Sequence, residues 1–362
     1  MWNGQLIFDS GDLFYDKFRV AEEHTEQINA TAKFIVDQFN ASGVAGITLG
    51  DRDTLLGAKQ LKALHKRAKF PFLVANLLDA TTGKPMFDDH TIVTVDGVKI
   101  GVFGVTMTGA ERRPVDGSPM PWRVDNPIKV AGEQVKALKA QGAEIVVALA
   151  HLPKATLKNL AEQVPGISAI LAGSGTRSMT HPDNEAGVFI CEAHSKGKYL
   201  SVLTLHIWNN RKATDPFVDR FKGQGLAQEI KKLTARLSSY ERLMEKKEAE
   251  AKKNPAGVVK SGTSVRARTI GADYYRKQLV KMRAEKASFE LELEGIEPPD
   301  PTANYVAYEL AAVKKSLPDE PKIGKEVTAF REKYPKLKPG VPKRPVPGTP
   351  PKRTKLKPAP KR

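Results

Sequence analysis

The chain has 362 residues, of which 40% are hydrophobic, and this length and composition suit one large folded domain with an additional part. Its formal net charge of +17 is uneven, because residues 335–362 contain ten Lys or Arg and no acidic residue. The basic excess is therefore no evidence for a nucleic-acid-binding fold. A single cysteine, Cys191, excludes an intrachain disulfide and any C-x-x-C metal or haem motif. No apolar stretch reaches the roughly 18–20 residues that a membrane span needs.

The first predicted strand, residues 6–9, runs into the polar turn Asp9-Ser10-Gly11-Asp12. Gly11 lets the backbone turn sharply where the strand stops, so Asp12 is expected to point into a cleft at the strand's carboxyl end. The simpler interpretation is that Asp9 and Asp12 are ordinary turn residues. The strand begins only a few residues after Met1, and no signal peptide is visible. We therefore expect the sequence to lack its true beginning, including one earlier strand.

Strand and helix patterns then alternate up to about residue 212. Helices are predicted over 20–41, 54–68, 128–141 and 154–163, and strands over 44–49, 72–75, 92–95, 99–105, 144–149, 169–171, 187–193 and 199–208. Asp96-Gly97 between two alternating runs indicates a β-hairpin. The order predicts a layered α/β domain over residues 1–212.

The rest of the chain has a different character. Leucines and other apolar residues recur at alternating spacings of four and three in 226–244 and again in 275–296, which predicts an antiparallel helical hairpin within residues 213–297. Two short helical segments, 303–316 and 322–334, are predicted within 298–334. Residues 335–362, with nine prolines among their basic residues, are predicted to be disordered.

Polar residues follow several of the predicted strands. The candidates are Asp12, the run Asp51-Arg52-Asp53, His151 and the loop Ser174-Gly175-Thr176. Carboxylates and imidazoles that converge from parallel strand ends bind divalent ions and support phosphoryl chemistry. A lone histidine after an apolar strand, such as His151, also suits a purely structural role.

Three motifs in this order carry a resemblance to a known family. Asp-Ser-Gly-Asp-Leu-Phe (9–14), Gly-Ile-Thr-Leu-Gly-Asp-Arg-Asp (46–53) and Ala-Leu-Ala-His (148–151) resemble the calcineurin-like metallophosphoesterases, particularly the 5′-nucleotidase and UDP-sugar hydrolase branch. The resemblance covers about residues 4–208. It implies a four-layer α/β/β/α sandwich with a metal site at the strand ends.

The resemblance also implies roles for individual residues, with several departures. Asp12 takes the position of the metal-bridging carboxylate, and His151 that of a histidine on the second metal. In the family's Gly-Asn-His motif, Asp51 replaces Asn and Arg52 replaces His, and an arginine stays charged and cannot give up a proton. Ser174 and Thr176 replace both histidines of a closing Gly-His-x-His, and the family's early Asp-x-His is not in this sequence.

Asp12, Asp51 and His151 are therefore expected to hold at most one ion, Mn²⁺, Mg²⁺, Zn²⁺ or Ca²⁺, with Arg52 in contact with phosphate. Neither haem nor a nucleotide cofactor is expected. The sequence leaves open whether the chain is an enzyme.

Two functions follow from these observations. The first is a 5′-nucleotidase-like phosphate-ester hydrolase with an incomplete dinuclear site, weak or inactive. The alternative is a non-catalytic binding or scaffold protein of the bacterial envelope, whose hairpin docks a partner and whose tail touches an acidic polymer or an anionic surface. No specific nucleic-acid partner is expected, because the tail has no aromatic residue to stack on bases. The expected location is the periplasm or envelope if a signal peptide is missing, and otherwise the cytoplasm.

Overall fold

A computed structural model describes residues 4–15, 24–107, 121–174, 181–193, 197, 199–208, 211–220, 222–253, 272–296, 300–313 and 321–334. The chain divides into two compact units, residues 1–317 and 318–362.

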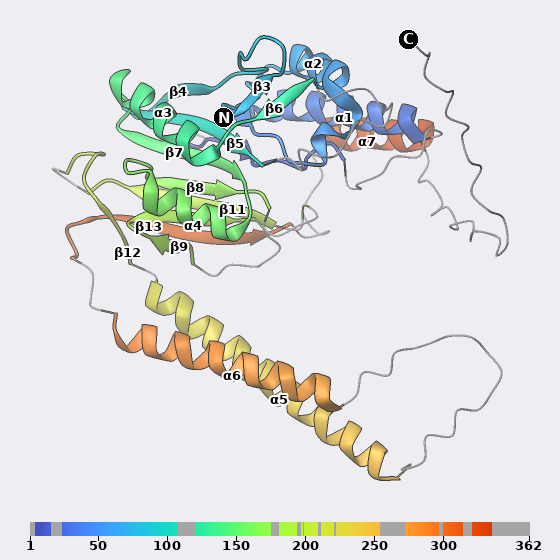
Figure 1. The fold of residues 1–362 in the computed structure, drawn as a ribbon, viewed down its shortest axis with the longest axis vertical. Helices are drawn as coiled ribbons and strands as arrows, with labels where there is room; N and C mark the ends of the chain where they lie inside the picture. Colours follow the sequence, from blue (N-terminus) through green and yellow to red (C-terminus); the bar gives the residue numbers. More distant parts are fainter. Residues whose placement is uncertain are drawn as a thin grey trace, which may run out of the picture. The chain divides into compact units, whose positions relative to one another are not determined.

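A six-stranded sheet lies at the centre of the first unit (Figure 1). Its order is β4 (His90–Val95), β5 (Val98–Thr106), β7 (Ile145–His151), β8 (Ala169–Ala172), β10 (Val188–Glu192) and β9 (Asp183–Glu185). Strands β5, β7, β8 and β10 are mutually parallel, so their carboxyl ends share one edge. β4 and β9 pair antiparallel on the two sides.

The other strands form three smaller sheets. β1 (Phe8–Asp9) pairs in parallel with β2 (Gly46–Ile47), and Ile47 bridges to Phe72. A separate three-stranded sheet has the order β11 (Tyr199–His206), β13 (Asn304–Ala312) and β12 (Phe217–Asp219). β3 (Leu77–Asp79) pairs with β6 (Trp122–Val124).

Helices cover the outer faces of the strand layers. α1 (Thr25–Ser42) and α2 (Gly57–Arg67), the latter preceded by a 3₁₀ turn (Asp53–Leu56), pack on the β1–β2 side. α3 (Pro127–Ala140) and α4 (Lys154–Gln163) pack on the far face of the six-stranded sheet. The predicted four-layer α/β/β/α sandwich is thus confirmed.

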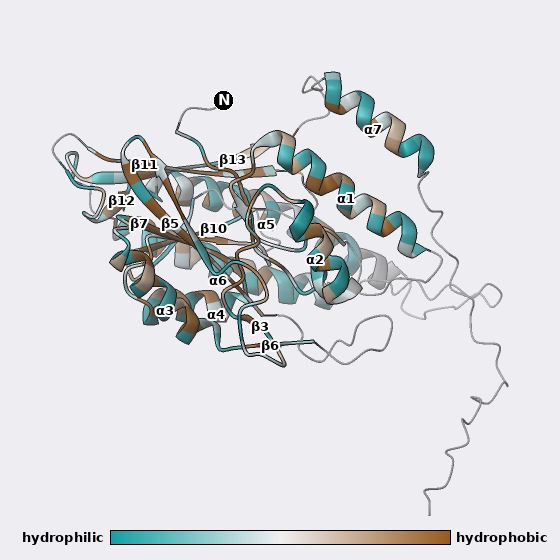
Figure 2. Cartoon of the chain, turned by 90° about the horizontal axis from the view of Figure 1, so that it is seen from above, coloured by the Kyte–Doolittle hydropathy of each residue, from teal (hydrophilic) through white to brown (hydrophobic). Residues whose placement is uncertain are grey.

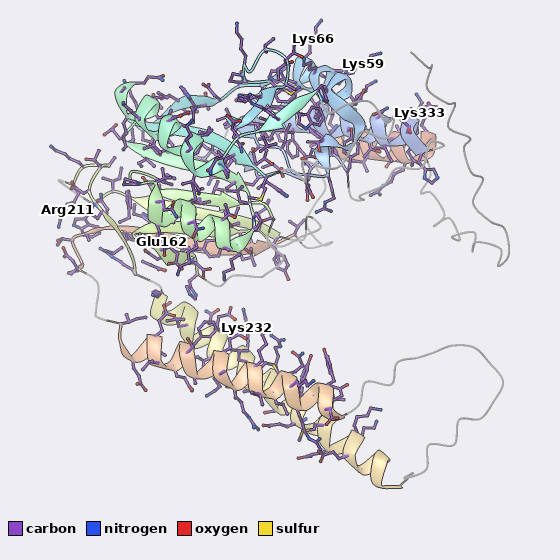
Figure 3. The ribbon with its side chains drawn as sticks, viewed as in Figure 1. Lys59, Lys66, Glu162, Arg211, Lys232 and Lys333 are labelled. Carbon is purple, nitrogen blue, oxygen red and sulfur yellow. The ribbon has the colours of Figure 1, made fainter. Side chains whose placement is uncertain are left out.

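Hydropathy explains this layering. The central strands are apolar along their length because both faces are covered (Figure 2). The helices keep charged side chains on their outer sides, as the labelled Lys59 and Lys66 of α2 and Glu162 of α4 show (Figure 3).

α5 (Lys222–Lys253) and α6 (Ala272–Glu294) form the predicted antiparallel hairpin. Ion pairs show the opposite directions of the helices, because Glu241 pairs with Arg283 at 2.7 Å and Glu248 pairs with Arg276 at 2.5 Å. The predicted apolar seam lies between the helices and contains Leu233, Leu237, Tyr240, Met244, Leu279, Met282 and Phe289.

The predicted helix over 303–316 is wrong, because the structure places the strand β13 there. β13 pairs antiparallel with β11 and parallel with β12, and Val306 is buried against Ala169 and Phe189 of the six-stranded sheet. The alanines of this segment favour a helix locally, but pairing with two strands outweighs that preference. The predicted domain end near residue 212 therefore leaves out β12 and β13, and the hairpin is an insertion between two strands of one sheet.

The second unit contains α7 (Pro321–Lys333), which confirms the second predicted helical segment. The tail predicted to be disordered, 335–362, lies outside the described residues. Within the described part of the chain, no helix combines the length and the apolar character that crossing a bilayer requires.

The only thiol of the chain tests the packing of β10. Burial raises the pKa of Cys191 well above its usual range, and the side chain is 2% exposed. We expect the native protein to react with Ellman's reagent far more slowly than the protein in guanidinium chloride, which should release about one equivalent of thiolate. Equal rates of reaction in both conditions would contradict the burial of Cys191.

Two neighbouring residues of α6 test the hairpin. Leu279 is 3% exposed between the helices, whereas Val280 is 68% exposed. Leu279→Ala is expected to lower the free energy of unfolding by about 2–5 kcal/mol. Val280→Ala, the matched control, should change it by less than about 0.5 kcal/mol. Urea denaturation followed by far-UV circular dichroism measures both, and equal effects would rule out the described packing.

Candidate metal centre

Three of the predicted site residues meet at the carboxyl edge of the strands. Asp12 follows β1, Asp51 follows β2, and His151 ends β7. One ligand atom from each residue lies within 4.8 Å of the other two. Parallel strands thus bring together residues that are far apart in the sequence.

Two glycines allow the turns after β1 and β2 to touch. Gly11 has a φ of +96°, and Asp12, which follows it, is itself left-handed with a φ of +62°. A Cβ atom on Gly50 would lie 2.3 Å from Asp12 Oδ1, and one on Gly11 would lie 2.5 Å from the Gly50 nitrogen. Larger residues would therefore separate Asp12 from the Asp51-Arg52-Asp53 turn.

The hydrogen bonds of His151 orient its imidazole for a cation. Nδ1 lies 3.1 Å from the Ser10 carbonyl oxygen, which can only accept, so the proton resides on Nδ1. In the neutral ring, the lone pair is then on Nε2, which lies 3.5 Å from Asp12 Oδ2 and 3.9 Å from Asp51 Oδ1. One imidazole nitrogen and two carboxylate oxygens are a donor set that fits one divalent ion.

Arg52 already supplies a positive charge to Asp12. The Arg52 backbone N–H donates to Asp12 Oδ1 at 3.0 Å, and Nε donates to Oδ2 at 2.7 Å, with Nη2 also in contact with Oδ2. The guanidinium thus forms a charge-assisted pair with Oδ2, and the backbone N–H bonds to Oδ1. A second metal ion beside the guanidinium would meet direct repulsion, so the donor set fits one ion better than two.

Two further carboxylates lie behind the site: Asp53, which the sequence placed in the candidate run 51–53, and Asp9, for which a turn role was one interpretation. Asp53 is fully buried and accepts hydrogen bonds from the backbone N–H groups of Asp12 at 2.7 Å, Phe14 at 2.8 Å and Gly50 at 2.9 Å. Burial raises its pKa to about 7, although these hydrogen bonds act in the opposite direction. In the sequence, Asp53 is simply the third polar residue of the turn 51–53, and no pattern there indicates that its side chain is buried.

Asp9 is the second such carboxylate. It accepts a hydrogen bond from the Gly11 N–H at 2.9 Å, and burial raises its pKa to about 6. Asp9 and Asp53 are held by backbone groups and shape the turns, and neither belongs to the group of three residues whose ligand atoms lie within 4.8 Å of one another.

The remaining predicted candidate, the 174–176 loop, is described only in part. Ser174 Oγ donates to the carbonyl oxygen of Leu152. Gly175 and Thr176 lie outside the described residues.

The raised pKa of Asp9 predicts a pH dependence of stability. Between pH 3.8 and about 6 the folded carboxyl keeps a proton that the unfolded one has lost, so this group's contribution to stability falls as pH rises. Asp9→Asn keeps the acceptor for Gly11 but cannot ionise, so its stability relative to the wild type should increase across this range. Urea denaturation at a series of pH values measures this. Asp37→Asn, which removes an exposed carboxylate on α1, is the control, and a constant difference for Asp9→Asn would contradict the prediction.

Sequence comparison finds relatives that match about half of the chain or less. An uncharacterised metallophosphoesterase of Bacillus subtilis (strain 168) is 28% identical over 205 residues, which are 56% of this chain and 42% of that protein. A 2′,3′-cyclic-nucleotide 2′-phosphodiesterase/3′-nucleotidase of Yersinia enterocolitica is 32% identical over 34% of this chain and 22% of its own. The chain thus spans less than half the length of these relatives. No family model matches it.

Solved structures give matches of modest similarity. The sulfate thiohydrolase SoxB of Thermus thermophilus has a TM-score of 0.49 at 23% identity, over 55% of this chain and 35% of that one. A 5′-nucleotidase precursor, also from Thermus thermophilus, has a TM-score of 0.48 at 19% identity, over 59% and 43% of the two chains. In sequence and in the order of its motifs, the N-terminal part of this chain is thus similar to metallophosphoesterases of the 5′-nucleotidase branch.

Proposed function

We propose that the α/β part of this chain binds phosphate esters through a single divalent ion held by Asp12, Asp51 and His151, and hydrolyses them weakly or not at all. Two of the relatives, a 5′-nucleotidase of Diplobatis ommata and the Yersinia enterocolitica enzyme, are named for phosphate esters of nucleotides, which supports this class of small molecule. The convergence of Asp12, Asp51 and His151 beside Arg52 is the observation that carries the proposal.

Each residue has a separate part in this proposal. His151 Nε2 and the oxygens of Asp12 and Asp51 form the cation site. A bound divalent ion supplies Lewis acidity that polarises a phosphoryl oxygen. Arg52 contacts another phosphate oxygen, which a guanidinium does well through paired N–H groups.

The same residues limit hydrolysis. Breaking a phosphate ester requires a proton for the leaving oxygen, and Arg52 stays charged and cannot supply it. A single metal ion also stabilises the transition state less than two metal ions that together hold the attacking and the leaving oxygen. Binding without rapid turnover is therefore the behaviour that this site supports best.

The alternative is the non-catalytic scaffold, and the Arg52–Asp12 ion pair favours it, because Arg52 can serve simply as a built-in cation for Asp12. The tail would then attract an anionic surface through its ten basic residues. Sedimentation of the full chain with vesicles of anionic lipid, compared with vesicles of neutral lipid, tests this function. Equal recovery with both vesicles would argue against it.

Metal content separates the two functions. We expect equilibrium dialysis against Mn²⁺ to give about one ion per folded chain, with slow p-nitrophenyl phosphate turnover at most. Asp12→Ala and His151→Ala should each abolish binding, whereas Asp37→Asn should keep it. No bound ion and no turnover would support the scaffold. About two ions with rapid turnover would show a working dinuclear enzyme, and unchanged binding in both alanine variants would refute the ligand set.

Arg52→Gln tests the phosphate contact. Loss of a charged hydrogen bond costs about 1.5–3 kcal/mol, so the affinity for inorganic phosphate in the presence of Mn²⁺ should fall about 10- to 100-fold. Mn²⁺ itself should bind at least as tightly, because Asp12 loses its competing cation. Isothermal titration calorimetry measures both. Arg67→Gln, which removes an arginine paired with Asp37 on the surface, is the matched control. An unchanged phosphate affinity in Arg52→Gln would mean that the guanidinium does not contact phosphate and only balances the charge of Asp12.

A further inference from the structure

The helix α6 carries apolar residues on two sides. One side forms the apolar seam with α5. On nearly the opposite side, Val280, Ala284, Ala287 and Leu291 recur at spacings of four, three and four, which places them in one line along the helix, here called the outer stripe. All four side chains are exposed, Val280 by 68% and Leu291 by 73%. Single exposed apolar residues are common, but a regular line of them indicates a surface that another helix covers.

The charges of α6 are divided between its two halves. The charged residues of 276–283 are all basic, and those of 288–294 are all acidic. This order opposes the helix macrodipole, which favours acidic residues near the N-terminus and basic residues near the C-terminus. It therefore weakens the isolated helix, and a neighbouring helix with the reverse order of charges would compensate it.

α5 uses only part of these charges. Several of them pair with α5, as Arg276 does with Glu248. Lys277 lies at one end of the outer stripe and Glu294 at the other, and both are exposed. Within the part of the chain that the structure describes, neither of them forms an ion pair. Both ends of the outer stripe thus carry charges that a partner can pair with.

We propose that two copies of this chain associate weakly through the outer stripes of their α6 helices, with the helices antiparallel. The two-fold axis passes through the middle of the stripe, so the basic half of each helix faces the acidic half of its partner. Parallel helices would place like charges together. Alanines at the middle let the helix axes approach closely. The residues that face one another across the axis are Val280 and Leu291, Ala284 and Ala287, and Lys277 and Glu294.

Other segments of this chain fit the outer stripe less well. The connection 254–271 contains three basic residues and no acidic one, and the tail 335–362 contains ten basic and no acidic residues. Each would therefore match the acidic half of α6 and be repelled by the basic half. Half of the connection, nine residues, spans about 31 Å when fully extended. Leu291 lies about 28 Å along the helix from its start, so the connection could barely reach it and return. A second copy complements both halves.

The contact is small, so the dimer is expected to be weak. Four apolar side chains from each helix cover far less than the roughly 1,600 Å² of an ordinary stable interface, and we expect a dissociation constant on the order of 100 μM. At the lower concentrations used for circular dichroism the chain is then monomeric, and Val280→Ala remains a valid control for the hairpin. The metal centre takes no part, so failure of this proposal would leave the proposed function untouched.

Sedimentation velocity of the full chain tests the proposal. Between about 5 and 500 μM, a range that brackets the expected dissociation constant, the weight-average sedimentation coefficient should rise from that of a monomer toward that of a dimer. Leu291→Gln should weaken association at least about tenfold, and because Leu291 is exposed the fold should persist. Lys246→Glu, which reverses an exposed charge on α5, is the control and should leave the rise unchanged.

Charge reversal tests the antiparallel arrangement. Lys277→Glu and Glu294→Lys should each weaken association about tenfold, because like charges then face across the two-fold axis. Both changes suit the macrodipole of α6, so a weaker helix would not explain the loss. The two changes combined in one chain should restore association. A monomer at every concentration, a dimer that Leu291→Gln does not weaken, or a double variant as weak as the single ones would overturn the proposal.

Discussion

The buried carboxylate of Asp53 holds together the two turns on which the candidate metal centre depends. It accepts backbone N–H groups from both sides, from Asp12 and Phe14 after β1 and from Gly50 after β2. These bonds fix Asp12 in its left-handed conformation, which is costly for a residue other than glycine. Without this acceptor, three buried or partly buried N–H groups would lose their partner, at about 1–3 kcal/mol each.

Charge balance then determines what the centre can hold. Asp12 and Asp51 bring two carboxylates to the edge of the sheet, and Nε2 of His151 lies 3.5 Å from Asp12 Oδ2 and 3.9 Å from Asp51 Oδ1. Arg52 offsets part of that negative charge from within the chain. The arrangement leaves a place for one cation and an anionic ligand, a smaller capacity than a dinuclear hydrolase requires. Our proposal that the site recognises a phosphate group and hydrolyses it weakly or not at all rests on this charge balance.

The helical hairpin interrupts a sheet without disrupting it. β12 ends just before α5, and β13 begins after α6 and pairs directly with both β12 and β11. The hairpin has its own apolar seam between α5 and α6. An inserted element with its own core can vary in length while the sheet remains the same.

The sequence by itself determined the layered α/β class, most of the helices, the hairpin and the three metal candidates. Apolar runs with period two or 3.6 and polar residues at strand ends are local signals, and burial on both faces explains why residues 145–150 are apolar throughout. The sequence also placed Arg52 beside the candidate ligands. It did not reveal β13, because pairing with β11, which is about a hundred residues earlier, is a long-range interaction that outweighs the helix preference of the alanines.

Tertiary structure alone decided how the candidates relate to one another. The proton position on His151 depends on the Ser10 carbonyl, which lies 141 residues away in the chain. The role of Asp53 depends on three backbone groups from two turns, and the pairing of Arg52 with Asp12 depends on the close approach of Gly11 and Gly50. Distances, burial and charge partners arise when separate strands meet at one edge, so no pattern within a single stretch of sequence encodes them.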